Sequence, residues 1–287
     1  MDKRNIIQAS WSIATNSYFI GFIRGRIYRG SLKRLCVPGL NCYSCPGALG
    51  ACPIGAMQAV IGGRQYQMSL FIAGFFMMVG ALCGRFICGF FCPFGLVQEL
   101  IYKIPFARKL NRFRGDRALR WLKYVILILF VILLPMLAVD AIGLASPWFC
   151  KYICPSGTLF AGIPLALANG SIRAALGNLF AWKMFVLAAL VMLSVIIYRP
   201  FCKYLCPLGA VYALFNRIAF ARMEVDSGAC VRCEACSGIC KMGCTPYINP
   251  NDTECVRCGD CVRSCPCSAL SMKPYIKRGR QSAARSK

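Results

Sequence analysis

The sequence RFICGFFCPFG at residues 85–95 returns at residues 199–209 as RPFCKYLCPLG. Both copies have an arginine, a cysteine three residues later, a second cysteine four residues further on, and then Pro-x-Gly. Cysteines at i and i+4 lie on one face of a helical turn, so their thiols point the same way. Proline ends or kinks such a turn, and glycine lets the chain fold back closely. Each copy is therefore half of a four-thiolate site, and we predict that the two halves meet.

Two further Cys-Pro-x-Gly units begin at Cys52 and Cys154, and Cys150 precedes the second of them by four residues. By the same reasoning they form an outer site together with the cysteine-rich loop before Cys52. The candidate ligands for one or two clusters there are Cys36, Cys42, Cys45, Cys52, Cys150 and Cys154. We favour one cluster with spare thiols. Cys83 is interpreted as a packing residue, because free cysteine is commonly an apolar core residue.

The composition indicates a membrane protein. Of 287 residues, 58% are hydrophobic and only 15% are charged, and the mean hydropathy is +0.57. Soluble proteins are less apolar and more charged. The chain has 21 cysteines and no histidine. This excludes haem and copper sites with imidazole ligands, Cys/His zinc fingers and histidine acid–base catalysis. Any metal must be held by sulfur.

Apolar stretches at residues 6–23, 68–84, 124–139 and 184–198 predict four transmembrane helices. The first contains several polar residues, so an interfacial helix is the alternative there. The cysteine motifs alternate with these stretches. The chain therefore divides into two parallel two-helix repeats, related by a pseudo-twofold axis along the membrane normal.

Basic residues set the predicted orientation. Seven lie between the second and third stretches: Lys103, Arg108, Lys109, Arg112, Arg114, Arg117 and Arg120. Only Lys151, Arg173 and Lys183 lie between the third and fourth. We therefore expect both termini on the cytoplasmic side of a bacterial or archaeal cytoplasmic membrane, although Arg29, Lys33, Arg34 and Arg64 in the first external loop run against this. The net charge of +24 is explained by membrane flanks rather than by nucleic-acid binding.

A cysteine-rich segment follows the last apolar stretch. CVRCEACSGIC at residues 230–240 and CVRCGDCVRSCP at residues 255–266 have the spacing of two-cluster bacterial ferredoxins, in which each fourth cysteine ligates the other cluster. The predicted ligands are Cys230, Cys233, Cys236 and Cys265 for one [4Fe–4S] cluster, and Cys255, Cys258, Cys261 and Cys240 for the second. Cys244 is the alternative to Cys240, and Cys267 has no assigned role.

These patterns predict three segments: a four-span membrane domain at residues 1–221, a small α+β ferredoxin domain at 222–272, and a basic flexible tail at 273–287. At the inner face we expect Cys88, Cys92, Cys202 and Cys206 to hold a further [4Fe–4S] cluster, with a four-thiolate zinc site as the alternative. Arg85 and Arg199 are candidates for raising the potential of that cluster. Anchoring at the membrane edge is their alternative role.

With these motifs the chain resembles the membrane polyferredoxins, which include NapH-type, NosR-type and YccM-type 4Fe-4S proteins. The resemblance rests on Cys88-x3-Cys92-Pro, Cys202-x3-Cys206-Pro and the paired ferredoxin motifs. It implies a membrane protein that moves electrons between quinol or cytoplasmic donors and extracytoplasmic reductases. The chain departs from the NapH-type pattern at Cys150, Cys154 and the first loop. It also lacks the flavin-bearing domain expected of NosR-type proteins.

We therefore expect an electron-transfer subunit that conducts electrons across or along the membrane. Its partners would be redox subunits or soluble carriers on both faces, together with membrane lipid, and a quinone is a further candidate ligand. A membrane quinol or metal-ion (for example copper) reductase and a redox-sensing regulator are the alternatives. One difficulty is distance: the hydrocarbon core is about 30 Å thick. For electron transfer between them, the two membrane sites must lie nearer the centre of the membrane, or another cofactor must lie between them.

Overall fold

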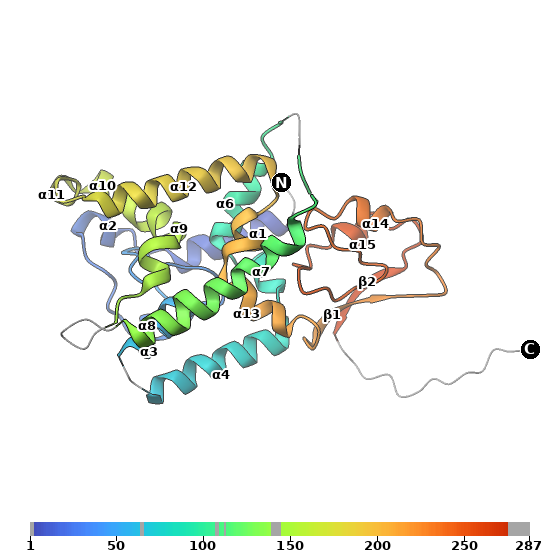
Figure 1. The fold of residues 1–287 in the computed structure, drawn as a ribbon, viewed down its shortest axis with the longest axis horizontal. Coiled ribbons are helices and arrows are strands. Elements are labelled where there is room, and N and C mark those ends of the chain that lie inside the picture. The colour runs from blue at the N-terminus through green and yellow to red at the C-terminus, as the bar shows by residue number, and fades with distance from the viewer. Residues whose placement is uncertain (1–2, 64–65, 107–108, 112, 139–144, 275–287) are drawn as a thin grey trace, which may run out of the picture.

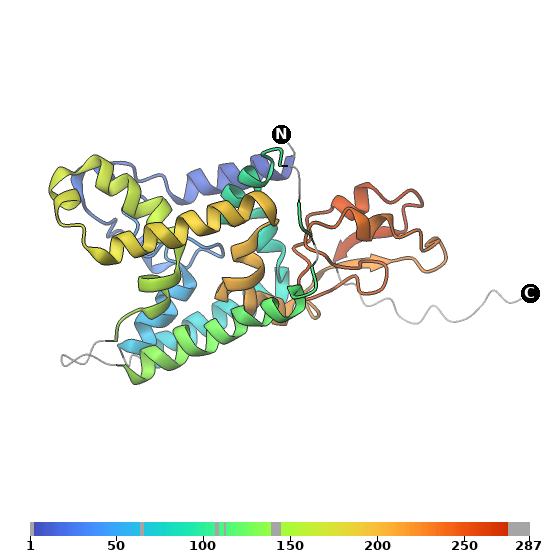
Figure 2. The same ribbon diagram turned by 45° about the horizontal axis from the view of Figure 1, so that its top comes forward.

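The computed structural model describes residues 3–63, 66–106, 109–111, 113–138 and 145–274. Most of the predicted tail, from residue 275, therefore lies outside the described residues. Three long helical segments follow the long axis of the molecule: α4 (Tyr66–Cys83), the helix Asp116–Leu137 and α12 (Asn178–Ile196). The C-terminal cysteine-rich segment lies beyond one end of them (Figures 1 and 2).

Two of the described helices are long and apolar enough to cross a membrane, namely Asp116–Leu137 and α12. The first is assembled from α7 (Asp116–Ile126), the π-helix η2 (Leu127–Leu133) and α8 (Leu134–Leu137). The helix α4 has 18 residues, and its part Leu70–Cys83 is apolar. Large apolar side chains face outward on these helices: Leu70 is 75% exposed and Met192 is 71% exposed. Such surfaces suit a lipid environment, and the protein is a membrane protein.

The first apolar stretch forms two helices, α1 (Lys3–Thr15) and α2 (Ile20–Arg24). The prediction of one continuous span over residues 6–23 is therefore wrong. A helix of 13 residues is about 20 Å long, which is less than the membrane core. Polar Asn5 and Gln8 are fully buried in α1, whereas Ile13 is 62% exposed. In this stretch Gln8 and Thr15 thus face protein, whereas Ile6, Ile7 and Ile13 face outward.

Each of the four Cys-Pro-x-Gly units starts a helix. The four helices α3 (Pro53–Gly62), α6 (Pro93–Tyr102), α9 (Pro155–Gly157) and α13 (Pro207–Phe215) begin at the proline, and the preceding cysteine has extended backbone angles. Proline suits the first helical position, because its missing N–H has no partner there in any case. We expected the proline to end the cysteine turn. It does so by starting the next helix, which sets a sharp change of direction at the second cysteine.

The turns before three of these helices, α6, α9 and α13, are short. They are α5 (Phe86–Phe90) and the π-helices η3 (Phe149–Ile153) and η5 (Phe201–Leu205). The amides of Cys154 and Cys206 donate to carbonyls five residues back, at 2.9 Å in both cases. π-Turns of this kind are frequent at functional sites. The remaining elements are the 3₁₀ turn η1 (Ser31–Arg34), the π-helix η4 (Thr158–Gly162), α10 (Ile163–Ala168) and α11 (Gly170–Ala174).

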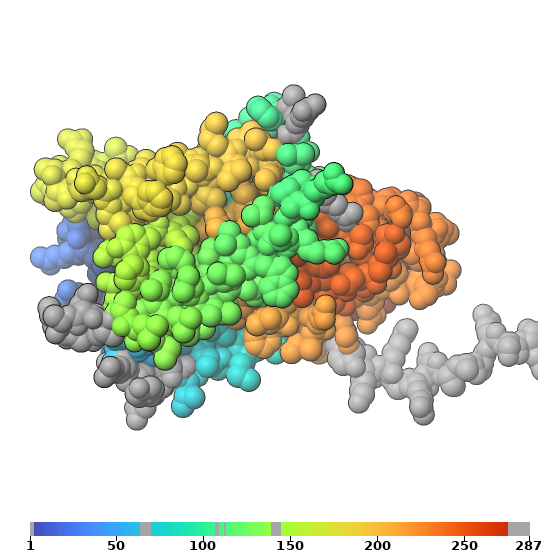
Figure 3. All heavy atoms as spheres, viewed as in Figure 1, coloured from blue at the N-terminus to red at the C-terminus, as the bar shows by residue number. Residues whose placement is uncertain are grey.

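The C-terminal segment is a small α+β unit. Strand β1 (Ala221–Val225) pairs antiparallel with β2 (Leu270–Pro274), and the short helices α14 (Ala235–Gly238) and α15 (Asp260–Arg263) lie between them in the chain. This unit packs directly on the helical part (Figure 3). Buried Arg257 fixes the contact, because its guanidinium donates to the carbonyl oxygens of Cys83 and Asn216 at 2.7 Å each.

Candidate iron–sulfur sites

Two cavities in the C-terminal unit are each lined by four cysteines of the predicted ligand sets. One is lined by Cys230, Cys233, Cys236 and Cys265. The other is lined by Cys240, Cys255, Cys258 and Cys261. Each cavity thus takes three cysteines from one motif and the fourth from the other. The spacing of the two motifs predicts the same exchange of the fourth cysteine. Cys267 also lines the first cavity.

Cys240 and Cys244 differ in their surroundings. Cys240 lines the second cavity, and its sulfur accepts a hydrogen bond from the amide of Cys244 at 3.3 Å. Hydrogen bonds from the Cys244 thiol and from neighbouring amides outweigh burial and lower the pKa of Cys240 to about 6. A lowered thiol pKa favours the thiolate, which is the form that binds metal. The geometry therefore favours Cys240 as the ligand.

The inner-face cysteines Cys88, Cys92, Cys202 and Cys206 are all buried and come together between α5 and η5. The thiols of Cys92 and Cys202 are in hydrogen-bonding contact, and the sulfur of Cys206 interacts electrostatically with those of Cys88 and Cys92. Polar donors already surround the sulfurs: the amides of Gly95 and Gly209 donate to Cys92 and Cys206 at 3.4 Å, and Gln98 Nε2 donates to Cys202 at 3.3 Å.

Arg85 and Arg199 cross between the two halves of this site. Arg85 donates through Nη2 to the carbonyl oxygen of Cys202 at 3.0 Å, and Arg199 donates through Nη1 to the carbonyl oxygen of Cys88 at 2.5 Å. Each arginine thus binds the cysteine of the other copy. Both are fully buried, so a role as exposed membrane-edge anchors is wrong. The motif glycines make room: a Cβ at Gly95 would lie 3.1 Å from Arg199, and one at Gly209 would lie 3.3 Å from Arg85.

A buried glutamate pairs with each crossing arginine. Arg85 binds Glu254 of the C-terminal unit at 2.6 Å, and Arg199 binds Glu99 of α6 at 2.7 Å. Each glutamate accepts from a second cation, Lys123 for Glu254 and Arg4 for Glu99. Burial alone would raise the pKa of Glu254, but the two cations outweigh it and lower the pKa to about 2. Glu254 is therefore a carboxylate, and the four cations outnumber the two glutamates beside the cysteines.

The sequence interpretation missed these glutamates, although a signal for Glu99 was present. It is the only acidic residue between positions 3 and 115. An isolated carboxylate in an apolar segment needs a buried cationic partner. Glu254 gives no such signal, because it lies in a segment that has other acidic residues.

Four outer-face cysteines line one cavity of about 350 Å3: Cys42, Cys52, Cys150 and Cys154. Lys183 also lines it and donates to the carbonyl oxygen of Cys150 at 3.2 Å. The structure does not bring the other two candidates to this cavity. Cys36 lines a separate cavity, and buried Cys45 donates to the carbonyl oxygen of Phe160 at 3.4 Å.

The inner and outer sites lie close to each other. Cys206 of the inner set and Cys154 of the outer set belong to one buried core, although they are in different sites. Tyr212 of α13 is part of the same core and donates to the carbonyl oxygen of Pro38 at 3.0 Å.

The inner site also touches the C-terminal unit. A Cβ at Gly89, directly after Cys88, would lie 2.5 Å from the carbonyl oxygen of Val256. Val256 follows Cys255, which lines the second cavity. Only glycine at position 89 permits this backbone contact.

The donor chemistry of the three cysteine-lined cavities fits iron–sulfur clusters. Each of these cavities has four cysteines of the predicted sets spread over its walls. A cubane is larger than one ion and is held by four thiolates, so its ligands are farther apart than those of a single zinc ion.

Comparison with known proteins agrees with this chemistry. The family described as a 4Fe-4S binding domain matches residues 66–112, 123–165 and 179–222. The chain is 30% identical to Uncharacterized protein MJ0750 of Methanocaldococcus jannaschii over 69% of this chain and 75% of that protein. It is 30% identical to the methylamine utilization ferredoxin-type protein MauN of Paracoccus denitrificans, over 67% and 60%.

A further relative is the regulatory protein NosR of Pseudomonas aeruginosa, which is 26% identical over 63% of this chain and 24% of its own length. No solved structure matches the chain. Sequence similarity, the matched 4Fe-4S binding family and the four-cysteine cavities agree. The chain belongs to the polyferredoxin family of NosR- and NapH-type 4Fe-4S electron-transfer proteins.

Proposed function

We propose that this protein carries electrons through the membrane along four [4Fe–4S] clusters, between a cytoplasmic or quinol donor and an extracytoplasmic redox partner. The ligand sets are the two ferredoxin cavities, the inner set Cys88, Cys92, Cys202 and Cys206, and the outer set Cys42, Cys52, Cys150 and Cys154. The clusters supply one-electron redox chemistry. The chain supplies ligation, spacing and insulation from water.

The observation that carries this proposal is the continuity of the four sites. The C-terminal unit touches the inner site at Gly89 and Val256, and the inner and outer cysteines Cys206 and Cys154 share one buried core. A shared core supports transfer between sites that lie closer together than the two edges of a membrane core of about 30 Å. The proposal needs no additional cofactor between the two membrane sites.

The charge arrangement supports an electron-accepting inner site. Two arginines and two further cations face two glutamates around it. A net positive charge near a cluster stabilises its reduced form. We place the C-terminal unit on the cytoplasmic side, on the strength of the basic residues between positions 103 and 120.

Electron transfer across a sealed membrane tests this proposal. The full chain is reconstituted into liposomes that enclose a membrane-impermeant dye acceptor, and a membrane-impermeant reductant is added outside. We expect dye reduction with the intact protein and its loss in Cys88→Ser/Cys202→Ser. Dye reduction that is the same in both would overturn the transmembrane route.

A second candidate function is a reductase that acts at the outer site. The outer cavity has about 350 Å3 of free space, against about 20 Å3 for each ferredoxin cavity. This extra space could admit a quinone ring or a metal ion beside the cysteines. Reduction of a quinone analogue or Cu(II) by the purified protein without a partner would favour this function.

A further inference from the structure

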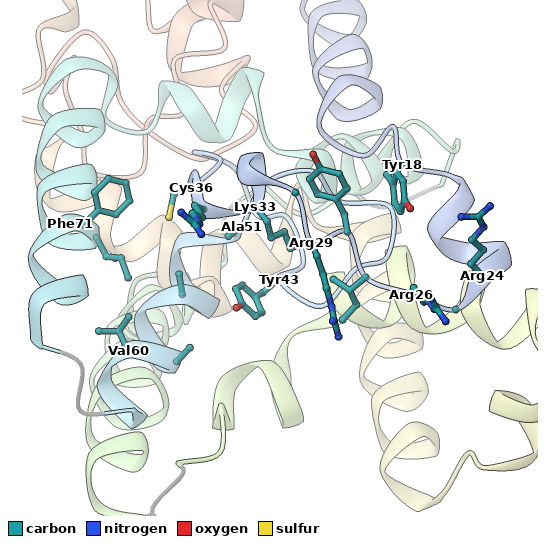
Figure 4. Close-up of a pocket in the computed structure, with 18 residues that line it drawn as sticks. Tyr18, Arg24, Arg26, Arg29, Lys33, Cys36, Tyr43, Ala51, Val60 and Phe71 are labelled. Atoms are coloured by element: carbon teal, nitrogen blue, oxygen red, sulfur yellow. The ribbon is translucent and has the colours of Figure 1, made fainter.

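A large cavity in the described part of the protein adjoins the outer four-cysteine cavity and has two chemically different sides. It measures about 1280 Å3 and lies between the loop after α2 and the helices α3 and α4. One side has basic residues, among them Arg24, Arg26 and Arg29 (Figure 4). The other side has apolar residues of the two helices, including Val60 and Phe71.

The basic side has no internal counter-charge. Arg24, Arg26, Arg29 and Arg34 are exposed, and within the described part of the chain none of them pairs with a carboxylate. The sequence explains why, because residues 3–98 contain no Asp or Glu at all. Several like charges in one cavity repel one another. Their arrangement calls for an anion from outside the chain.

The apolar side continues onto the outward surface of α4. Phe71 is 51% exposed and its neighbour Leu70 is 75% exposed. An anion that entered this cavity alone would leave these side chains uncovered. A ligand with an anionic head and an apolar tail would cover both sides at once.

We propose that this cavity binds an anionic phospholipid, with the phosphate between the arginines and an acyl chain along α3 and α4. Tyr43 lines both this cavity and the outer four-cysteine cavity, so the lipid would lie against one wall of the outer site. The proposal does not depend on how many clusters the protein holds. The proposal also explains why basic residues lie in the first external loop, although basic residues generally favour the cytoplasmic side of a membrane.

Native mass spectrometry of the full chain in detergent tests the proposal, with phosphatidylglycerol, phosphatidylcholine and inorganic phosphate as the probes. We expect retained phosphatidylglycerol. Each arginine contributes about fivefold to the affinity for an anionic headgroup. Arg26→Gln/Arg29→Gln should therefore weaken binding at least about tenfold. A second pair, Arg24→Gln/Arg34→Gln, should weaken it similarly.

The matched control is Arg173→Gln/Arg217→Gln, which removes the same charge at two exposed positions outside the cavity. It should leave lipid binding within about twofold of the original. Iron content should be unchanged in all of these variants. Phosphatidylglycerol binding that is unaffected by both cavity pairs would overturn the proposal. Equal affinity for phosphatidylcholine, or for inorganic phosphate alone, would overturn it too.

Binding of an acidic redox protein at these arginines is the competing occupant. If Arg26→Gln/Arg29→Gln slowed reduction of an acidic acceptor protein while phosphatidylglycerol binding stayed intact, the cavity would be a protein-docking surface and the lipid assignment would be wrong.

Discussion

Arg85 donates a hydrogen bond to the carbonyl oxygen of Cys202, at 3.0 Å and across 117 positions of the chain. Arg199 makes the reciprocal contact, because it donates to the carbonyl oxygen of Cys88. The two halves of the inner site are thus joined by the arginines as well as by the cysteines. Because both arginines are fully buried, their charge acts at low dielectric, where its influence on a neighbouring group is large.

The crossing arginines should set the redox potential of the inner site. Arg85→Gln removes a buried positive charge, so the reduced form loses stabilisation and the potential should fall by about 50–100 mV. Arg85→Lys keeps the charge and should shift the potential less. A redox titration followed by electron paramagnetic resonance measures this, using the signal that is lost in Cys88→Ser/Cys202→Ser. An unchanged potential in both Arg85→Gln and Arg199→Gln would rule out tuning by these residues.

Cys240 and Cys244 should respond differently to substitution. Cys240→Ser removes a cysteine that lines the second ferredoxin cavity and should lower the iron content by about four atoms per chain. Cys244→Ser should keep that iron, because Cys244 does not line the cavity. The reverse result would identify Cys244 as the ligand and contradict the assignment of Cys240.

The outer ligand set can be separated from its neighbours in the same way. Cys150→Ser and Cys154→Ser should each abolish binding of the outer cluster. Cys36→Ser and Cys45→Ser should not, because these thiols do not line the four-cysteine cavity. Iron and acid-labile sulfide counts on anaerobically purified protein distinguish the two groups. Loss of iron in Cys45→Ser would require a different outer set.

Gly89→Ala should disturb the contact between the C-terminal unit and the inner site. The added Cβ would meet the Val256 carbonyl at 2.5 Å, so we expect a loss of about 1–3 kcal/mol in the free energy of unfolding. Electron transfer from the C-terminal unit should also slow. Gly74→Ala is the matched control, because a Cβ there meets nothing within 4 Å. Equal behaviour of the two variants in stopped-flow reduction would argue against this contact as the route.

Local spacing predicted which cysteines line each ferredoxin cavity, because three of the four in each set lie within seven consecutive residues. The repeat likewise indicated that Cys88, Cys92, Cys202 and Cys206 meet. Contacts that depend on tertiary structure could not be predicted from the sequence. The pairing of Arg85 with Glu254 joins residues 169 positions apart, and the choice of Cys42 over Cys45 depends on how one loop turns.

The first apolar stretch shows the limit of hydropathy. Its length predicted a span, but Gln8 donates to the carbonyl oxygen of Cys92 at 2.6 Å and Arg4 pairs with Glu99. Those polar side chains were the sign of a helix that faces the protein on one side. The mean hydropathy of a stretch averages over both sides of a helix and does not show which side is polar.

The number of clusters tests the central claim most directly. Iron and acid-labile sulfide should be counted on anaerobically purified full-length protein, beside Cys88→Ser/Cys202→Ser. We predict about sixteen iron and sixteen sulfide atoms per chain, and about twelve of each in the variant. Zinc at the membrane sites, or about eight iron atoms in both proteins, would confine the clusters to the C-terminal unit and contradict the proposed route.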